Sequence, residues 1–274
     1  MTPTDPNPTL RVLTWNLWWQ FGPWEERQPA IAMVLARERA DIVCLQEVWA
    51  SDRGVDQAAL LANRLGLHHA RTPSPFWNGL SFGNAILSRW PILDTSSLPL
   101  PGIDGSASPR QALVAHIDAP FGPVTVICAH LDFRFDRSEQ RSSQLSVICD
   151  HAVQHHTDPD TTFPLLLCGD LNAVPDSDEM RSLTGRRPPY GAGLVFTDAW
   201  DAAGDGTPGY TWDAANVYLA DATWPNRRLD YILTSWPRQR GVGKPVRCRL
   251  SGTAPIDGIM PSDHYAVVAD LRVQ

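Results

Sequence analysis

Long apolar segments and interdomain linkers are both missing from this chain of 274 residues. No apolar run approaches the roughly 20 residues that a helix needs to cross a bilayer, so we expect no transmembrane segment. No Ser- or Gly-rich tract divides the chain, and the Pro/Gly clusters at 99–109 and 186–193 predict loops. Residues 1–9 are polar and rich in proline, which predicts a flexible arm rather than a signal peptide. We therefore expect one domain over residues 10–274.

The cysteines form no pattern that would bind zinc or build a disulfide framework. There are five of them, an odd number, and no two are spaced as Cys-x-x-Cys. Cys44, Cys128 and Cys168 each lie in an apolar stretch, where a thiol packs as a small hydrophobic group. These features disfavour disulfides and predict a reducing, cytoplasmic location.

Positive charge is also scarce, and Lys244 is the single lysine. Chemistry that needs a Schiff-base or phosphate-loop lysine is therefore disfavoured. A formal net charge of −7 lacks the positive footprint of proteins that coat long nucleic acids. A metal-assisted nuclease stays open, because a bound metal supplies positive charge locally.

The most informative stretch that is present is LLLCGDLN at 165–172. Its apolar half is long enough for a strand buried inside a sheet. The strand stops at Gly169, which eases a turn, so Asp170 and Asn172 are delivered at a strand end.

Apolar periodicity predicts an α/β protein with strands and helices alternating at first and strands paired later. Strands are expected at 10–14, 42–45, 84–88, 111–118, 124–129, 165–169, 230–234 and 264–273. Helices are expected at 23–39, 56–65, 138–155 and 177–183. The short spacing at 119–123 predicts a hairpin turn. This order suggests two sheets packed face to face and covered by helices.

The residues that close these strands are carboxylates, amides and imidazoles, without a thiol. They are Asn16, Glu47, His130, Asp170, Asn172, Asp230, Asp263 and His264. Hard oxygen ligands favour Mg²⁺ or Mn²⁺ over zinc. Because Mg²⁺ uses few protein carboxylates together with substrate phosphate oxygens, the set predicts metal-assisted attack of water on phosphorus.

Seven short motifs resemble, in order, those of the endonuclease/exonuclease/phosphatase superfamily, which has the deoxyribonuclease I-like fold. They are TWN (14–16), QE (46–47), GNAILSR (83–89), AHL (129–131), GDLNA (169–173), RLDYI (228–232) and SDH (262–264). Each is weak alone, but their order is specific, and the resemblance covers residues 11–272. It implies an α/β (α+β) fold, a four-layer α/β/β/α sandwich of two packed mixed β-sheets flanked by helices.

The resemblance also implies a role for each strand-end residue. Glu47 resembles the principal metal ligand, with Asn16 and Asp263 completing the metal surroundings. His130 and Asn172 resemble donors to the phosphate oxygens.

The remaining roles concern proton transfer and substrate phosphate. Asp170 resembles the residue that positions or deprotonates water, and Asp230 resembles the carboxylate that orients His264. The sequence does not decide whether Asp170 or His264 is the base. Contacts to substrate phosphate are expected from Arg110, Asn84 and Arg134.

Structural roles compete with these interpretations. Asn16 and Asp230 are equally suited to turns or caps, and Glu47 also fits the first turn of a helix. The aromatic loop 17–24 follows Asn16 directly, so it must lie near the metal, where stacking on substrate and packing are both open.

The leading functional interpretation is a monomeric, Mg²⁺- or Mn²⁺-dependent phosphodiesterase acting on nucleic acid or nucleotide-like esters. The first alternative is a phosphatase or phospholipase-C/sphingomyelinase-like hydrolase of phosphorylated lipids or sugars. The second is an inactive binding scaffold. Trp18 occupies a position where apurinic endonucleases of the superfamily carry an acid, which disfavours an apurinic endonuclease. A nuclease should gather Arg53, Arg110, Arg134 and Arg137 around the metal, and a lipid hydrolase should expose Trp and Phe there.

Overall fold

The computed structural model describes residues 8–155, 162–236 and 238–274, and these form two six-stranded mixed sheets packed face to face. The first sheet has the order β11 (Pro245–Ser251), β12 (Ala266–Arg272), β1 (Thr9–Asn16), β2 (Ile42–Ser51), β4 (Leu80–Ser88) and β3 (His68–Arg71). The second has the order β5 (Ile92–Pro99), β6 (Gln111–Ala119), β7 (Gly122–His130), β8 (Leu166–Asp170), β10 (Asp230–Ser235) and β9 (Phe196–Asp198).

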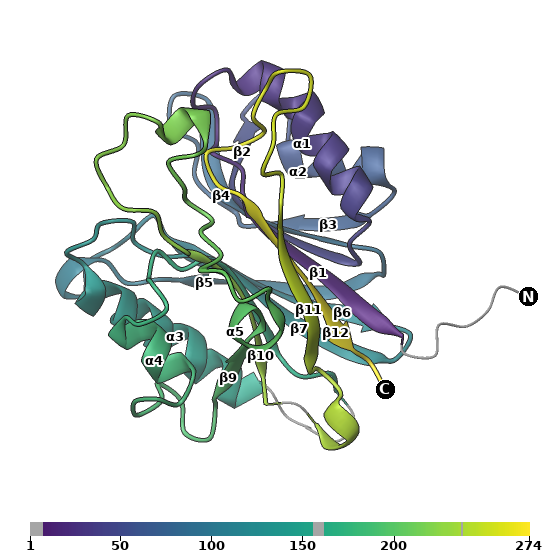
Figure 1. Ribbon diagram of the computed structural model, residues 1–274, viewed down its shortest axis with the longest axis vertical. Coiled ribbons are helices and arrows are strands. Elements are labelled where there is room, and N and C mark those ends of the chain that lie inside the picture. The colour runs from purple at the N-terminus through teal and green to yellow at the C-terminus, as the bar shows by residue number, and fades with distance from the viewer. Residues whose placement is uncertain (1–7, 156–161, 237) are drawn as a thin grey trace, which may run out of the picture.

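Helices cover the outer faces of both sheets, so the described chain has four layers (Figure 1). The helices are α1 (Trp24–Glu38), α2 (Gln57–Leu65), α3 (Ser138–His155), α4 (Asp178–Leu183) and α5 (Ala199–Ala203). In Figure 1, α1 and α2 lie on the first sheet, and α3 and α4 lie on the second. The predicted four-layer sandwich is confirmed. No helix in the described ranges is long and apolar enough to cross a membrane.

Three buried apolar clusters correspond to these layers. One lies between the sheets and includes the thiols of Cys44, Cys128 and Cys168. The other two lie between each sheet and its helices. All five cysteines are buried and free of disulfide bonds. Burial of these apolar side chains is the main term that stabilises the sandwich.

The helices follow their sequence signals closely. Asp56 caps the N-terminus of α2 by accepting hydrogen bonds from the main-chain N–H groups of Ala58 and Ala59. Gly66 ends α2 in the left-handed conformation, with φ of 68°, as expected of a glycine after a helix. Ser177 caps α4 in the same way as Asp56 caps α2.

Several strand predictions need correction. The strand expected to end before Gln46 continues as β2 to Ser51, and an irregularity between Leu45 and Val48 interrupts its pairing with β4. Strands β5, β9 and β11 were missed, because they are short or half-exposed and lack an apolar run. Residues 1–7 of the expected arm lie outside the described residues, and Thr9 already belongs to β1.

The topology brings the ends of the central strands to one edge of the sandwich. β1 runs parallel to β2, and β7 runs parallel to β8, so each pair ends on the same side. Within the second sheet, Asp170 lies between His130 on β7 and Asp230 on β10 in register. The start of β1 and the end of β12 lie at the opposite end, where Thr9 pairs with Arg272.

Candidate active site

The strand ends surround a pocket of about 380 Å³. Seven of the eight strand-end residues line it: Asn16, Glu47, His130, Asp170, Asn172, Asp263 and His264. Asp230 lies behind His264 and contacts the pocket through it. The structure therefore gathers residues that span the chain from residue 16 to 264.

Asp170 is the centre of the hydrogen-bond network. Its Oδ2 accepts a hydrogen bond from Asn16 Nδ2 at 3.0 Å, and its Oδ1 accepts one from the main-chain N–H of Asn172 at 3.0 Å. Asn16 Nδ2 also donates to Glu47 Oε1 at 3.2 Å, so this amide joins the two carboxylates. The Asn16 oxygen accepts from the Trp18 N–H at 2.9 Å, which fixes the orientation of the amide.

Glu47 reaches the pocket from a local backbone distortion. It lies in the bulge of β2 with φ of 54°, a left-handed conformation that is uncommon for residues other than glycine. The bulge turns the side chain toward the second sheet. Its Oε1 accepts from Asn16, but Oε2 is buried without a hydrogen-bond partner. Burial raises the pKa of Glu47.

A divalent cation fits this group of carboxylates. Burial raises the pKa of Asp263 to about 7, and the negative charge of Glu47 adds to this effect. A buried carboxylate oxygen without a partner is costly unless a cation or donor satisfies it. Glu47 and Asp263 would therefore hold the metal, which agrees with the preference of Mg²⁺ for a few carboxylates.

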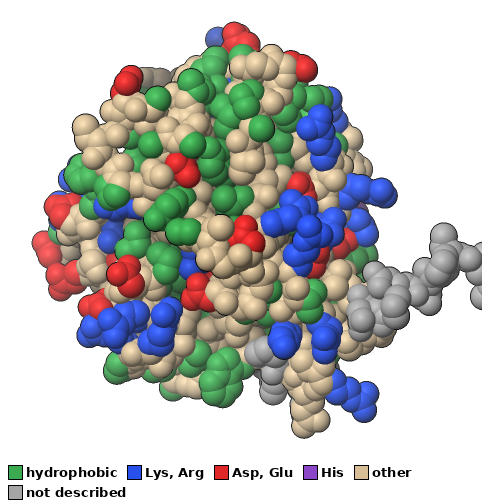
Figure 2. Space-filling view, in the orientation of Figure 1, with side chains coloured by type: hydrophobic (Ala, Val, Ile, Leu, Met, Phe, Trp, Pro, Cys, Tyr) green, Lys and Arg blue, Asp and Glu red, His purple; other side chains and the backbone are tan. Residues whose placement is uncertain are grey.

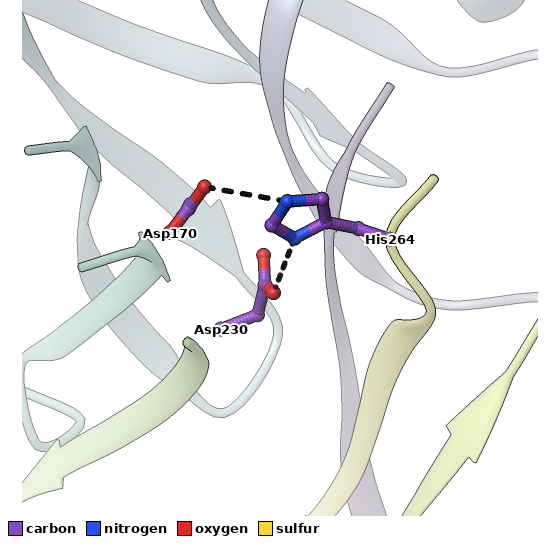
Figure 3. Close-up of side chains that lie close together, drawn as sticks. All are labelled: Asp170, Asp230 and His264. Carbon is purple, nitrogen blue, oxygen red and sulfur yellow. Dashed lines mark hydrogen bonds and ion pairs between the residues drawn. The ribbon is translucent and has the colours of Figure 1, made fainter. Parts of the chain in front are cut away.

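A second acidic group, formed by Asp170, Asp230 and His264, has ligand atoms within 4.8 Å of one another (Figure 3). His264 Nδ1 lies 2.8 Å from Asp230 Oδ2, and its Nε2 lies 3.9 Å from Asp170 Oδ2. Burial lowers the pKa of His264, but the charges of Asp230 and Asp263 outweigh burial and raise the pKa well above its ordinary value. A protonated imidazole has no lone pair for a metal, so in this state the group suits proton transfer better than metal binding.

His130, unlike His264, is held in its neutral form, and Arg110 contributes to this. Arg110 Nη1 lies 2.7 Å from His130 Nδ1, and because a guanidinium only donates, Nδ1 must accept and the ring proton lies on Nε2. Burial and the charges of Arg110 and His264 lower the pKa of His130 well below its ordinary value. Its Nε2 lies 3.5 Å from Asp170 Oδ2. His130 is thus a neutral donor at the pocket.

The three residues expected at substrate phosphate lie in different surroundings. Arg110 lines the pocket and also orients His130. Asn84 Nδ2 donates to the main-chain oxygen of Gln111 at 2.7 Å, so its amide braces the strand that follows Arg110. Arg134 is exposed and is not among the residues that line the pocket.

Aromatic side chains form much of the remaining wall of the pocket. The wall contains Trp18, Phe21, Phe82, Phe133, Phe135 and Trp212. Phe21 and Phe133 are 48% and 59% exposed, so they form part of the mouth. Within the loop, Trp18 lines the pocket, whereas Trp24 packs edge-on against Trp49.

A buried arginine that sequence analysis did not single out holds this loop. Arg27 is fully buried. It donates five hydrogen bonds to the main-chain oxygens of Leu17, Trp18, Trp19, Phe21 and Pro261. Its guanidinium also lies 4.9 Å from the Trp18 ring centroid. It therefore joins the aromatic loop to the segment that leads into Asp263.

Replacing Arg27 by methionine is expected to lower the free energy of unfolding by at least about 3 kcal/mol, because carbonyls left without donors cost about 1–3 kcal/mol each. Urea denaturation would measure the change. Arg37→Met, an exposed change in the same helix, is the matched control. Equal stabilities of the two variants would show that Arg27 is not the link.

The chain belongs to the Endonuclease/Exonuclease/phosphatase family, whose family model matches residues 13–264. Tyrosyl-DNA phosphodiesterase 2 of Xenopus tropicalis is 23% identical over 271 residues, which cover 95% of this chain and 65% of that protein. The chain thus spans just under two thirds of that relative's length.

Solved structures show the same fold. An endonuclease/exonuclease/phosphatase from Beutenbergia cavernae is 28% identical with a TM-score of 0.73, over 96% of this chain and 71% of that one. TDP2 of D. rerio in complex with a single-strand DNA product is 20% identical with a TM-score of 0.74, over 96% of this chain and 99% of that one.

Proposed function

We propose that this chain hydrolyses phosphodiester bonds of nucleic acid or nucleotide-like substrates with the help of Mg²⁺ or Mn²⁺. The observation that carries the proposal is the buried Glu47 Oε2, which has no hydrogen-bond partner and lies in a pocket with Asp263, Asp170 and two histidines. The bound metal would supply Lewis-acid stabilisation of the charge that develops on the phosphate.

The protonation states of the pocket residues indicate a different catalytic role for each. Burial and the charge of Asp230 raise the pKa of Asp170 to about 6, so this carboxylate is mostly ionised at neutral pH. His264 keeps its proton, since its pKa is raised. We therefore assign Asp170 as the base that takes a proton from water and His264 as a cationic donor to the phosphate. His130 and Asn172 donate further hydrogen bonds to the phosphate oxygens.

The distribution of charge favours a short or single-stranded substrate over a long duplex. On the face shown in Figure 2, Lys and Arg side chains lie in several separate groups instead of one continuous stripe. The four arginines expected to gather at the metal are dispersed. Arg110 lines the pocket, while Arg53 and Arg137 line other depressions. Aromatic walls suit unpaired bases, which stack on such side chains.

The names of the relatives agree with this substrate class, because one is a tyrosyl-DNA phosphodiesterase and another was solved with a single-strand DNA product. The exposed Phe21 and Phe133 at the mouth favour a second candidate, a hydrolase of phosphorylated lipids.

A small substrate panel would separate the two candidates. We expect hydrolysis of bis(p-nitrophenyl) phosphate and single-stranded DNA in Mg²⁺ or Mn²⁺, and loss of both activities in excess EDTA. Duplex DNA and sphingomyelin vesicles complete the panel, with release of phosphate ester products as the readout. Cleavage confined to vesicles would replace the nucleic-acid assignment with the lipid one. Absence of any turnover would favour an inactive binding scaffold.

A further inference from the structure

A second, larger pocket of about 800 Å³ adjoins the catalytic pocket. Both are lined by Phe135 and Asn172, so these two residues lie at the boundary of the two spaces. Prolines and aromatic rings form much of its wall, among them Trp200 and Tyr210. A substrate whose reacting phosphate lies beside Asn172 would extend past Phe135 into this second pocket.

Most charged side chains of the second pocket are already paired. Arg141 Nε lies 2.8 Å from Glu179 Oε1, and Arg228 Nη1 lies 2.6 Å from Asp198 Oδ2. Asp178 pairs with an arginine outside the pocket wall, and Asp176 is exposed on the rim, where water screens it.

Arg227 differs from these arginines. Its guanidinium carbon lies 3.6 Å from the centroid of the Phe135 ring, and no hydrogen bond or ion pair of its side chain is found in the described part of the chain. Burial and the like charge of Arg141 lower the pKa of Arg227, and no carboxylate acts against them. Its positive charge is therefore uncompensated within the described ranges.

The contact with Phe135 leaves the N–H groups of the Arg227 guanidinium available to bind an anion. A guanidinium that lies on an aromatic face keeps its N–H donors in the ring-parallel plane, free to form a bidentate contact with a phosphate. Trp224 packs against the same Phe135 ring at 4.5 Å and is 54% exposed, so it offers a surface on which a base can stack. Phe135 thus carries both groups at the boundary of the two pockets.

We propose that Arg227, stacked on Phe135, binds a second phosphate of the substrate, next along the chain from the phosphodiester that is cleaved. This inference rests on the proposed function and narrows it, because it makes the preferred substrate a phosphate-bearing nucleotide chain rather than an isolated diester. Arg227 is then a specificity-determining residue outside the catalytic pocket.

The test uses two substrates that differ by one group: thymidine 5′-(p-nitrophenyl phosphate) with and without a 3′-phosphate. The readout is the ratio of their kcat/KM values, measured by release of p-nitrophenolate. The wild-type protein is expected to prefer the 3′-phosphorylated compound, and Arg227→Met is expected to reduce the ratio roughly tenfold, as for loss of a charge-assisted contact. Arg64→Met, an exposed change of equal charge on α2, should leave the ratio unaltered.

The outcomes separate this inference from the proposed function. Turnover of both compounds with a ratio that Arg227→Met does not change would overturn the inference and leave the phosphodiesterase standing. If neither compound is hydrolysed, the proposed function fails, and calorimetric binding of the same two compounds decides the inference. A dissociation constant that rises about tenfold with Arg227→Met only for the 3′-phosphorylated compound supports it, and equal constants overturn it.

Discussion

Glu47→Ala is expected to reduce metal-dependent hydrolysis of a phosphodiester by about 10³-fold or more, because a metal contributes several kcal/mol of transition-state stabilisation. The fold should survive, since the side chain makes one hydrogen bond, from Asn16, and its other oxygen has no partner. The change removes a buried charge and leaves β2 and β4 paired on both sides of the bulge.

Two measurements separate a lost metal from a lost fold. The circular dichroism spectrum of Glu47→Ala should match that of the wild-type protein, and its melting temperature should be no lower than that of the metal-free wild-type protein. The melting temperature of the wild-type protein should rise with Mn²⁺, and that of the variant should not. Glu47→Gln, which keeps an acceptor for Asn16 but not the charge, is the matched control and should lose activity almost as far. Retained activity in both variants would contradict the metal assignment.

Asp230→Asn is expected to reduce kcat by about 10²-fold or more, as for other losses of a preorganised electrostatic group. The carboxylate of Asp230 is the largest influence that raises the pKa of His264, with Asp263 and Asp170 adding to it. Removing that charge lowers the pKa of His264, so the ring loses its proton at a lower pH. Substrate binding should change less than kcat, because the charge matters most when negative charge develops on the phosphate.

The pH dependence gives the sharper test. In the wild-type protein, activity should rise as Asp170 ionises near its pKa of about 6 and fall as His264 loses its proton above its ordinary range. Asp230→Asn should move the alkaline limb toward lower pH, because His264 loses the charge that most raises its pKa. The acid limb should also move toward lower pH, because the charge of Asp230 raises the pKa of Asp170. The ion pair of Asp230 and His264 should also stabilise the fold. Because the pKa of His264 is raised in the folded protein, this contribution is fully present below about pH 6.5, the ordinary pKa of a histidine. It is lost as the pH rises through the raised pKa of His264. An unmoved alkaline limb would show that the two groups are not coupled.

The strand-end residues were predictable because most of them lie at one end of a buried apolar strand, as Asp170 does at the end of β8 and Asp230 at the start of β10. LLLC before Gly169, for example, has no stable place outside a sheet, and the residue after such a strand is fixed at its edge. The parallel pairs then bring His130 and Asp170 side by side in register. The metal identity, the substrate and the roles of individual residues stay predictions.

Other features depend on contacts between distant segments and leave no local signal. The left-handed backbone of Glu47 arises where β2 and β4 differ by one step in register, which a single strand does not encode. In the sequence, Arg27 resembles a surface residue of an amphipathic helix. In the structure, its guanidinium donates hydrogen bonds to main-chain oxygens of two loops. Arg227 stands beside Arg228 and resembles it, although only Arg228 has carboxylate partners.

The backbone at the pocket also bears on how the chain tolerates change. Trp18, Trp19, Glu47 and Asn172 all have positive φ angles, a conformation that costs residues with side chains about 1–2 kcal/mol each. Together with the buried carboxylates, these angles make the pocket edge costly to fold when it holds no ligand. Random substitutions that stabilise this protein are therefore expected to concentrate at the edge that does the chemistry, and selection for heat resistance alone would erode activity first.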